Sequence, residues 1–246
     1  MTVWRLIPLW EGRGQIQMAV DRWLFDRCYR GLHPPVLRFY GWTPAAISLG
    51  QHQRAWPPHW QALRWQDRPI DLVRRPTGGR AVLHAGDLTY CIVLPHQSGH
   101  RRQTYEYLCE FLIRGWRSLG VELQFGTAGR GYQHQVNCFE SATAADLVTS
   151  DGFKLIGSAQ GWQRQTVLQH GSMQLQLDPD LQRQVFGEGA EAGVAAIAHR
   201  GTLPSADAIV DTLARAAAAH FEAVFEVSPL TASEWKSIQG YLDPPG

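Results

Sequence analysis

Hydrophobic and polar positions follow helical spacing in some parts of the chain and strand spacing in others. Apolar residues three to four positions apart predict amphipathic helices over residues 14–30 and 102–119, the second ended by Gly120. Runs rich in β-branched and aromatic residues are typical of strands. They predict strands over residues 35–40, 45–49, 70–75, 80–84, 88–94 and 165–177, with residues 41–44 interrupting the first two.

Proline, alanine and glycine mark further elements. Paired prolines predict a helix over residues 57–65, because proline suits the first helical turn. Pro179 predicts the start of another helical segment, and the alanine-rich residues 205–225 predict a long helix. Residues 126–137 hold three glycines among polar residues and predict a loop.

A hairpin is predicted where Asp151 and Gly152 separate two short apolar runs, residues 146–149 and 153–157. Helices and strands mix along the chain without strict βαβ alternation. This order favours an α+β (mixed α/β) fold over a Rossmann fold. No repeat or low-complexity linker divides the chain. We therefore expect one domain over residues 1–246, with a helical C-terminal part from about residue 181.

The composition is that of a folded globular protein, with 44% hydrophobic and 18% charged residues. A net charge of +1 predicts binding to neither nucleic acid nor an anionic membrane. No apolar run reaches the ~18–20 residues that span a bilayer, and the N-terminal apolar stretch is too short for a signal peptide. The four cysteines lack the paired spacing of a disulfide framework or a zinc site. We expect a cytoplasmic protein with free thiols and no metal.

A glycine pair stands out in residues 74–84, which read Arg-Arg-Pro-Thr-Gly-Gly-Arg-Ala-Val-Leu-His between two predicted strands. Gly78 and Gly79 would let the backbone approach a ligand closely, although a tight turn is the simpler alternative. No Gly-Lys-Ser/Thr follows, so the segment is not a P-loop. His170 lies within a predicted strand. It either binds a ligand or acts as a general base, or it is a hydrogen-bonded histidine of the core.

Cys138 differs from the other cysteines in its surroundings. Cys28, Cys91 and Cys109 stand among apolar neighbours and are typical of small buried side chains. Cys138 follows the glycine-rich loop of residues 126–137, where a thiol can be exposed enough to act as a nucleophile.

Lysine is almost absent, since only Lys154 and Lys236 are lysine among 23 basic residues. Strand alternation places Lys154 on the same face as Ile156 and opposite Leu155, so both faces carry apolar residues. Burial lowers the pKa of a lysine, and such an amine can move protons near neutral pH. The alternative is a lysine that protects a sheet edge from aggregation. Lys236 has the setting of a surface residue.

Several of these segments together resemble the signature of the lipoate- and biotin-protein ligase superfamily. The match covers roughly residues 1–180. It includes, in order, residues 15–21, 40–42, 48–53, 74–84, 137–141, 146–148, 154–160 and 168–172. The Cys-Phe pair before the lysine hairpin resembles one branch, the cysteine-dependent octanoyltransferases of lipoate assembly. Two departures concern the Gly-Gly-Arg segment, where many ATP-using ligases have a third glycine, and residues 165–167, which lack an expected glycine turn.

The resemblance implies a fold with a larger mixed sheet and a smaller sheet, flanked by helices. It implies that Cys138 is the nucleophile and Lys154 the acid and base, in a monomer that needs no cofactor. The donor would be octanoyl-acyl carrier protein, and the acceptor a lysine of a lipoyl domain or of the glycine cleavage H protein. The same resemblance assigns substrate binding to Arg75, Gly78, Gly79, His84, Gly157, Ser158, Ala159, His170 and Gly171.

Three alternatives stay open at this stage. An ATP-dependent lipoate or biotin ligase would form an acyl-adenylate and would not need Cys138. A lipoyl or octanoyl amidotransferase would share the thioester chemistry but move the group between carrier proteins. A non-enzymatic carrier-binding module would have no use for both Cys138 and Lys154.

Overall fold

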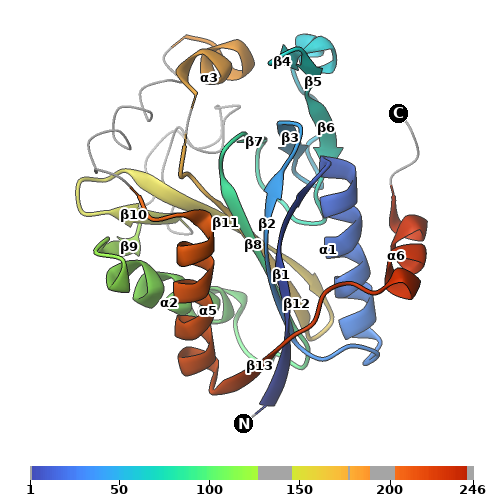
Figure 1. Cartoon of the computed structure of the whole chain (residues 1–246), viewed down its shortest axis with the longest axis vertical. Coiled ribbons are helices and arrows are strands. Elements are labelled where there is room, and N and C mark those ends of the chain that lie inside the picture. Colours follow the sequence, from blue (N-terminus) through green and yellow to red (C-terminus); the bar gives the residue numbers. More distant parts are fainter. Residues whose placement is uncertain (1, 127–145, 177, 189–202, 243–246) are drawn as a thin grey trace.

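A large mixed sheet forms the centre of the computed structural model, which describes residues 2–126, 146–176, 178–188 and 203–242 (Figure 1). Within these residues the sheet has eight strands. From edge to edge they are β13 (Ala223–Val227), β1 (Thr2–Gly12), β2 (Val36–Trp42), β8 (Leu88–Leu94), β12 (Thr166–Met173), β11 (Lys154–Gln163), β10 (Asp146–Thr149) and β9 (Leu123–Phe125). β1 runs parallel to β13 and β2, and all other neighbours are antiparallel.

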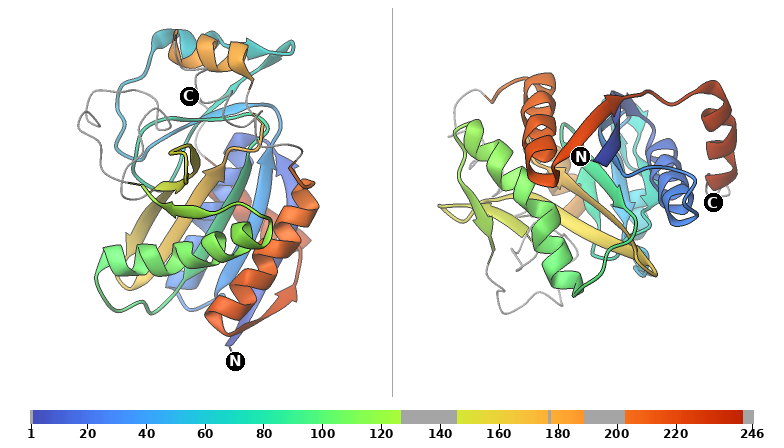
Figure 2. Two further views of the ribbon diagram at one scale, coloured as in Figure 1. Left: turned by 90° about the vertical axis from the view of Figure 1, so that its left-hand side faces the viewer. Right: turned by 90° about the horizontal axis from the view of Figure 1, so that it is seen from below.

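Helices cover both faces of this sheet (Figures 1 and 2). α2 (Arg101–Ser118) and α5 (Ala206–Phe221) pack on one face, where Phe111, Trp116 and Leu213 belong to one buried cluster. α1 (Gly14–Tyr29) packs on the other face with α6 (Ala232–Ile238) beside it, and the apolar side chains of α1 form a second cluster. Both faces are therefore buried, which explains why the central strands read as almost continuous apolar runs.

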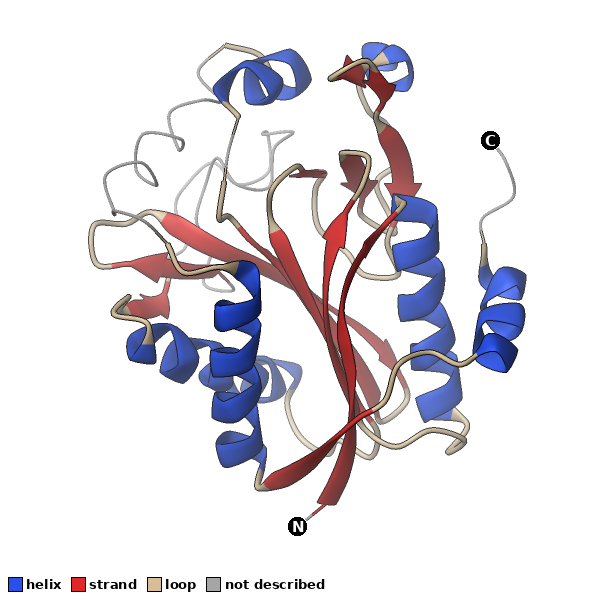
Figure 3. Ribbon diagram, in the orientation of Figure 1, coloured by secondary structure: helices blue, strands red, loops and turns tan. Residues whose placement is uncertain are grey.

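A smaller sheet lies beyond one end of the large one (Figure 3). In it β3 (Ala46–Leu49) runs parallel to β6 (Asp71–Arg74) and antiparallel to β7 (Val82–His84). The remaining short elements are η1 (Pro58–Ala62), β4 (Arg64–Trp65), β5 (Arg68–Pro69), α3 (Pro179–Phe186) and η3 (Gln239–Tyr241). Fully buried Trp60 donates a hydrogen bond to the Val185 carbonyl at 2.8 Å, which ties η1 to α3. The predicted α+β arrangement of two unequal sheets with helices outside is confirmed.

Several local predictions are wrong. Residues 57–65 form only the 3-10 turn η1 and the short β4, because a helix there would lose the pairing of β4 with β5. The helix predicted over 205–225 ends at Phe221, since Glu222 adopts a left-handed conformation (φ 50°) and the chain turns into β13. The C-terminal part is therefore not helical throughout. Residues 41 and 42 continue β2 and do not interrupt it.

The two strands of the predicted hairpin are β10 and β11, and β11 continues beyond the predicted end to Gln163. A two-residue turn, residues 164 and 165, connects β11 to β12, and Gln163 pairs with Thr166 on either side of it. Arg164 takes the left-handed conformation there (φ 51°), so the turn forms without the glycine that the family pattern has. Within the described residues, no helix combines the length and apolar character needed to cross a membrane.

Arg5 fastens the C-terminal helix α6 to β1. Its guanidinium donates hydrogen bonds to Glu234 Oε1 and Oε2 at 2.6 and 2.9 Å. Partial burial acts to raise the pKa of Glu234, but hydrogen bonds and charge from Arg5 outweigh it and lower that pKa to about 2. The contact thus stabilises the fold at neutral pH through a carboxylate that remains charged well into the acid range.

Glu234→Gln is expected to lower the free energy of unfolding by about 1 kcal/mol at pH 7, a value reduced by solvent screening of the partly exposed Glu234. Because the folded-state pKa lies below the ordinary 4.5, the advantage of the glutamate is present above pH 4.5 and disappears as the pH falls toward about 2. Urea unfolding of both proteins at pH 7 and pH 3 measures this. An equal difference at both pH values would contradict it.

Candidate active site

A pocket opens where the large sheet meets the small one. Its walls come from α1, from five strands of the large sheet, and from β3, β7 and the glycine segment between β6 and β7. It is lined by Met18, Tyr40, Trp42, Ser48, Arg75, Gly79, Val82, His84, Thr89, Asp146, Lys154, Gly157, Ser158, Ala159, His170, Gly171 and Ser172. Apolar rings and polar groups therefore share the same cavity, as is typical of a small-molecule site.

The fold gathers nearly all of the predicted site residues at this pocket, although they are spread over about a hundred residues of sequence. Eight of the nine predicted substrate-binding residues line it, and so does Lys154. Gly78 is the exception, since it is not among the lining residues. Cys138 lies outside the described residues.

Lys154 is buried, with 5% of its surface exposed, and its Nζ forms an ion pair with Asp146 Oδ1 at 2.9 Å. Asp146 and Lys154 meet diagonally across the hairpin, because Lys154 pairs with Val148 and Asp146 pairs with Gly157. The prediction that Lys154 shares a face with Ile156 is wrong. Lys154 lines the pocket, whereas Ile156 packs in the core cluster, and a register shift in the hairpin separates their environments.

Arg75 holds the glycine segment in place. Its buried guanidinium donates to the carbonyl oxygens of Gly78 (2.8 Å), Arg80 (2.7 Å) and Ser48 (2.8 Å). Position 79 requires glycine, because its φ is 96° and a Cβ there would lie 2.7 Å from Arg75 Nη2. The close approach that the structure shows is between the segment and Arg75, and the predicted approach to a ligand stays a prediction.

Gly50 is the tightest contact of this segment, because a Cβ on it would lie 1.9 Å from the Gly79 carbonyl oxygen. Gly50→Ala is expected to push the glycine segment away from its position on the pocket wall. A displacement of about 1 Å near the reacting groups lowers rates by about 10²-fold. Steady-state kinetics against Gly240→Ala, where a Cβ meets nothing within 4 Å, measures the effect. Equal activity of the two variants would show that the segment is only a turn.

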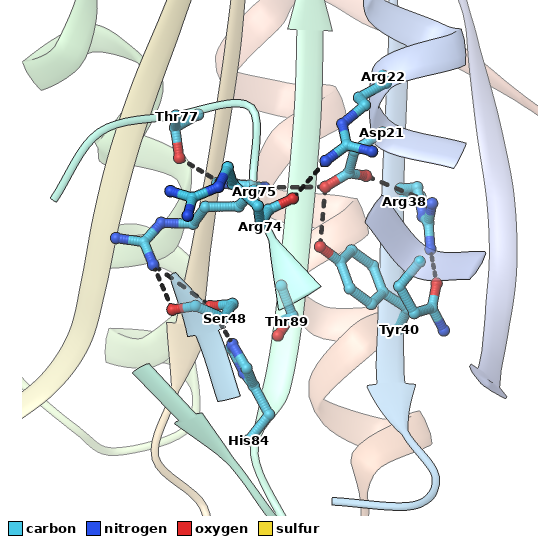
Figure 4. A network of polar contacts seen from close by, with 12 residues as sticks. Asp21, Arg22, Arg38, Tyr40, Ser48, Arg74, Arg75, Thr77, His84 and Thr89 are labelled. Carbon is cyan, nitrogen blue, oxygen red and sulfur yellow. Dashed lines mark hydrogen bonds and ion pairs between the residues drawn. The ribbon is translucent and has the colours of Figure 1, made fainter. Parts of the chain in front are cut away.

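A buried network connects α1 with β12 (Figure 4), and two of its members, Tyr40 and His170, line the pocket. Asp21 Oδ2 accepts hydrogen bonds from the Tyr40 hydroxyl at 2.9 Å and from His170 Nδ1 at 2.8 Å, and Arg38 contacts Oδ1 at 3.3 Å. Burial lowers the pKa of His170, although Asp21 opposes the shift. Burial acts to raise the pKa of Asp21, but His170 and Arg38 outweigh it and lower that pKa. A neutral imidazole held by a carboxylate results.

A second network of the same kind lies on the pocket wall itself. His84 Nε2 is 2.8 Å from Ser48 Oγ, and His84 Nδ1 is 2.8 Å from Asp87 Oδ2. Both His84 and Ser48 line the pocket. No group of three or more His, Cys, Asp or Glu residues that could hold a metal ion occurs among the described residues.

The three cysteines that the structure describes are buried, as predicted. Burial raises the pKa of the Cys28 and Cys109 thiols to about 12, and that of Cys91 well above its ordinary value. Because the thiolate is the reactive form, these positions are unsuited to nucleophilic catalysis.

Sequence reasoning missed the charged and hydroxyl partners of the predicted residues. Asp146 and Ser48 are included in the sequence prediction only within segments of the family pattern, and Asp87 is not singled out. A signal was available for Asp87, because an acidic residue three positions after His84, at the start of a buried strand, is costly unless it is paired.

The chain is similar to known proteins over most of its length. The lipoyl protein ligase A/B catalytic domain family matches residues 13–219. The octanoyltransferase LipM of Kyrpidia tusciae is 40% identical over 191 residues, covering 73% of this chain and 69% of the relative. LipM of Lysinibacillus sphaericus is 35% identical over 203 residues, covering 78% and 72%.

Solved structures show the same fold at lower identity. Lipoate-protein ligase A bound with ATP superposes with a TM-score of 0.81 at 21% identity, covering 98% of this chain and 94% of that one. The Thermoplasma acidophilum protein Ta0514 with bound lipoic acid superposes with a TM-score of 0.79 at 22% identity, again covering 98% and 94%.

Proposed function

This chain belongs to the lipoyl protein ligase A/B catalytic domain family, and from that premise we propose that it moves an octanoyl group from octanoyl-acyl carrier protein to a lipoyl-carrier lysine through a thioester on Cys138. It is an acyltransferase of lipoate assembly, as its LipM relatives are octanoyltransferases. The observation that carries the proposal is the pocket, in which a buried Lys154 stands beside apolar rings and the glycine segment.

The acyl chain occupies the apolar part of the pocket, beside Met18, Tyr40, Trp42 and Val82. An octanoyl group buries seven methylene or methyl carbons, and at ~0.8 kcal/mol each this contributes about 5–6 kcal/mol of binding. The polar end, with the thioester carbonyl, then lies toward Lys154 and Gly157. Backbone N–H groups of the glycine segment or of Gly157 and Ser158 stabilise the oxyanion, an effect worth ~3–4 kcal/mol for one good donor.

In the first half-reaction the Cys138 sulfur attacks the thioester carbonyl of the donor. A new C–S bond forms, the phosphopantetheine C–S bond breaks, and Lys154 carries the thiol proton to the leaving sulfur. Exchange of one thioester for another is nearly isoenergetic, so ATP is not required. Cys138 precedes Asp146 by eight residues, and because a segment of that length spans up to about 28 Å, the sequence separation allows the thiol to reach the pocket.

In the second half-reaction the amine of a lysine on a lipoyl domain or an H protein attacks the acyl-cysteine. An amide forms and the Cys138 thiol is regenerated. Amide formation from a thioester is downhill and pulls the cycle forward. The raised thiol pKa values of Cys28, Cys91 and Cys109 support Cys138 as the nucleophile, because those three thiols stay protonated.

Intact-mass measurement tests the proposal. The enzyme mixed with octanoyl-acyl carrier protein should gain one octanoyl group without ATP, and Cys138→Ser should gain none. An adduct that persists in that variant, or that maps to another cysteine, rejects Cys138. Acylation of the carrier lysine only from free octanoate with ATP would instead identify an ATP-dependent ligase.

A further inference from the structure

The Ser48, His84 and Asp87 side chains form a continuous hydrogen-bonded chain that opens on the pocket. Ser48 Oγ lies 2.8 Å from His84 Nε2, and His84 Nδ1 lies 2.8 Å from Asp87 Oδ2. All three residues are less than a tenth exposed. The indole of Trp42 stacks on the imidazole at a centroid distance of 3.9 Å and an angle of 16°, which fixes the plane of the ring.

The surrounding hydrogen-bond donors indicate which atoms of Ser48, His84 and Asp87 carry the protons. Asp87 Oδ2 also accepts hydrogen bonds from the hydroxyls of Ser172 (2.6 Å) and Thr89 (3.1 Å), so it acts as the acceptor for His84 Nδ1–H. In a neutral imidazole, His84 Nε2 is then the unprotonated nitrogen and accepts the Ser48 hydroxyl hydrogen. Arg75 Nη1 donates to the same Ser48 oxygen at 3.3 Å, which agrees with this direction (Figure 4).

This polarity is that of a proton relay. Ser48 lines the pocket, its hydroxyl lies at hydrogen-bond distance from the His84 imidazole, and the imidazole is backed by the buried Asp87 carboxylate. The second Asp87 oxygen, Oδ1, is buried and accepts no hydrogen bond from the described residues. Its charge is therefore well placed to stabilise an imidazolium that forms on His84, as the aspartate of a catalytic triad does.

The protein contains a second network with the same order of groups, hydroxyl, imidazole and carboxylate, but its hydroxyl does not line the pocket. Thr77 Oγ1 lies 2.6 Å from His170 Nε2, and His170 Nδ1 lies 2.8 Å from Asp21 Oδ2. Thr77 does not line the pocket, whereas Ser48 does. Asp21 is also shared with Arg38 and Tyr40. In this second network only His170 lines the pocket and the hydroxyl of Thr77 does not, so Thr77 serves as an internal control for Ser48.

We propose that Ser48, His84 and Asp87 accept the proton of the incoming lysine in the second half-reaction, with Asp87 as the positioning residue. The acceptor arrives as an ammonium and must lose one proton before it can attack. The ammonium loses two protons in all, and Lys154, beside Asp146, carries one of them to the departing sulfur as in the first half-reaction, so the other proton needs a separate acceptor. The inference rests on the proposed octanoyl transfer.

The steps balance as follows. The ammonium gives a proton to Ser48 Oγ, whose own proton moves to His84 Nε2. The neutral amine attacks the acyl-cysteine carbonyl, a C–N bond forms and the C–S bond breaks. The second amine proton goes to the departing sulfur, and His84 later releases its proton to solvent. The products are the amide, the free Cys138 thiol and one proton.

The test uses a nucleophile that needs no base. Acyl-enzyme is prepared from octanoyl-acyl carrier protein, and its decay is followed by intact mass with a lipoyl domain or with hydroxylamine, which is neutral at pH 7. In Asp87→Asn, transfer to the lipoyl domain should fall by at least ~10²-fold, the usual size of a general-base effect. Decay with hydroxylamine should stay within a few-fold of wild type. Equal slowing with both nucleophiles, or no slowing, overturns the relay.

Matched variants keep this outcome separate from misfolding and from the proposed function. Ser48→Ala, a smaller change, should show the same selective loss, and Thr77→Val should leave the ratio of the two decay rates unchanged. Asp87→Glu should recover part of the transfer. If the wild-type enzyme forms no acyl-enzyme at all, the proposed function fails, whereas acyl-enzyme with an unaltered ratio in Asp87→Asn and Ser48→Ala rejects the relay alone.

Discussion

Lys154→Arg is expected to slow acyl-enzyme formation by ~10²–10⁴-fold while the fold is retained. Arginine can form the same ion pair with Asp146, so the buried charge stays compensated. It stays protonated at neutral pH and cannot carry a proton from the attacking thiol to the leaving one. The loss should therefore appear in the chemical step and not in the stability of the protein. Single-turnover kinetics with octanoyl-acyl carrier protein and urea unfolding measure the two separately.

The chain supplies its own control, because its only other lysine, Lys236, is exposed on α6. Lys236→Arg should react at a rate within a few-fold of wild type. If Lys154→Arg reacts just as well, the amine acts only through its charge, and the thiol proton must be carried by another group.

The elements that the sequence predicted well depend on local signals. The spacing of apolar positions predicts the helices α1 and α2. Gly120, which has a positive φ, lies just after the end of α2 as predicted. The Asp151-Gly152 turn predicts the β10–β11 hairpin because the residues that decide it are adjacent. Such signals do not depend on which segment lies opposite in the fold.

The pairing of β1 with β13 at one edge of the large sheet could not be predicted from local sequence signals. β1 pairs with β13 through contacts such as Thr2 with Ala223, more than two hundred residues apart. Neither segment has clean alternation, because β1 carries a register shift and β13 lies at an edge. The alanine-rich helix was overextended for the same reason, since pairing with β1 outweighs helix propensity after Glu222.

The site could be predicted in part because its residues recur in recognisable segments. Residue types in the glycine segment and around His170 suggested ligand binding before any fold was known, and most of them do line one pocket. Their partners could not be deduced in this way. Asp21 reaches His170 from 149 residues away, and Ser48 reaches His84 only because β3 pairs with β7. Hydrogen-bond geometry of this kind follows from tertiary packing and leaves little trace in sequence.

Arg38→Met is expected to destabilise the protein by about 3–5 kcal/mol, a large part of the 5–15 kcal/mol that ordinary domains have. Arg38 and Asp21 are both fully buried, and Arg38 also donates to Gln17 Oε1 and lies over the Tyr40 ring at 4.0 Å. Methionine fills much of the space but leaves the Asp21 carboxylate without its cation. The cost is that of a stranded buried charge, not of a lost contact alone.

The pH dependence of stability distinguishes the cost of the unpaired buried charge from the cost of the lost contacts. With Arg38 present, the pKa of Asp21 is lowered, and without it burial acts to raise that pKa. The carboxylate of the variant therefore takes up a proton as the pH falls, and the deficit relative to wild type should shrink. Adding Asp21→Asn to Arg38→Met removes the charge and should recover part of the lost stability at pH 7. Urea unfolding at pH 7 and pH 5 decides the matter. A deficit that is independent of pH, with no recovery in the double variant, would mean that Arg38 acts through packing alone.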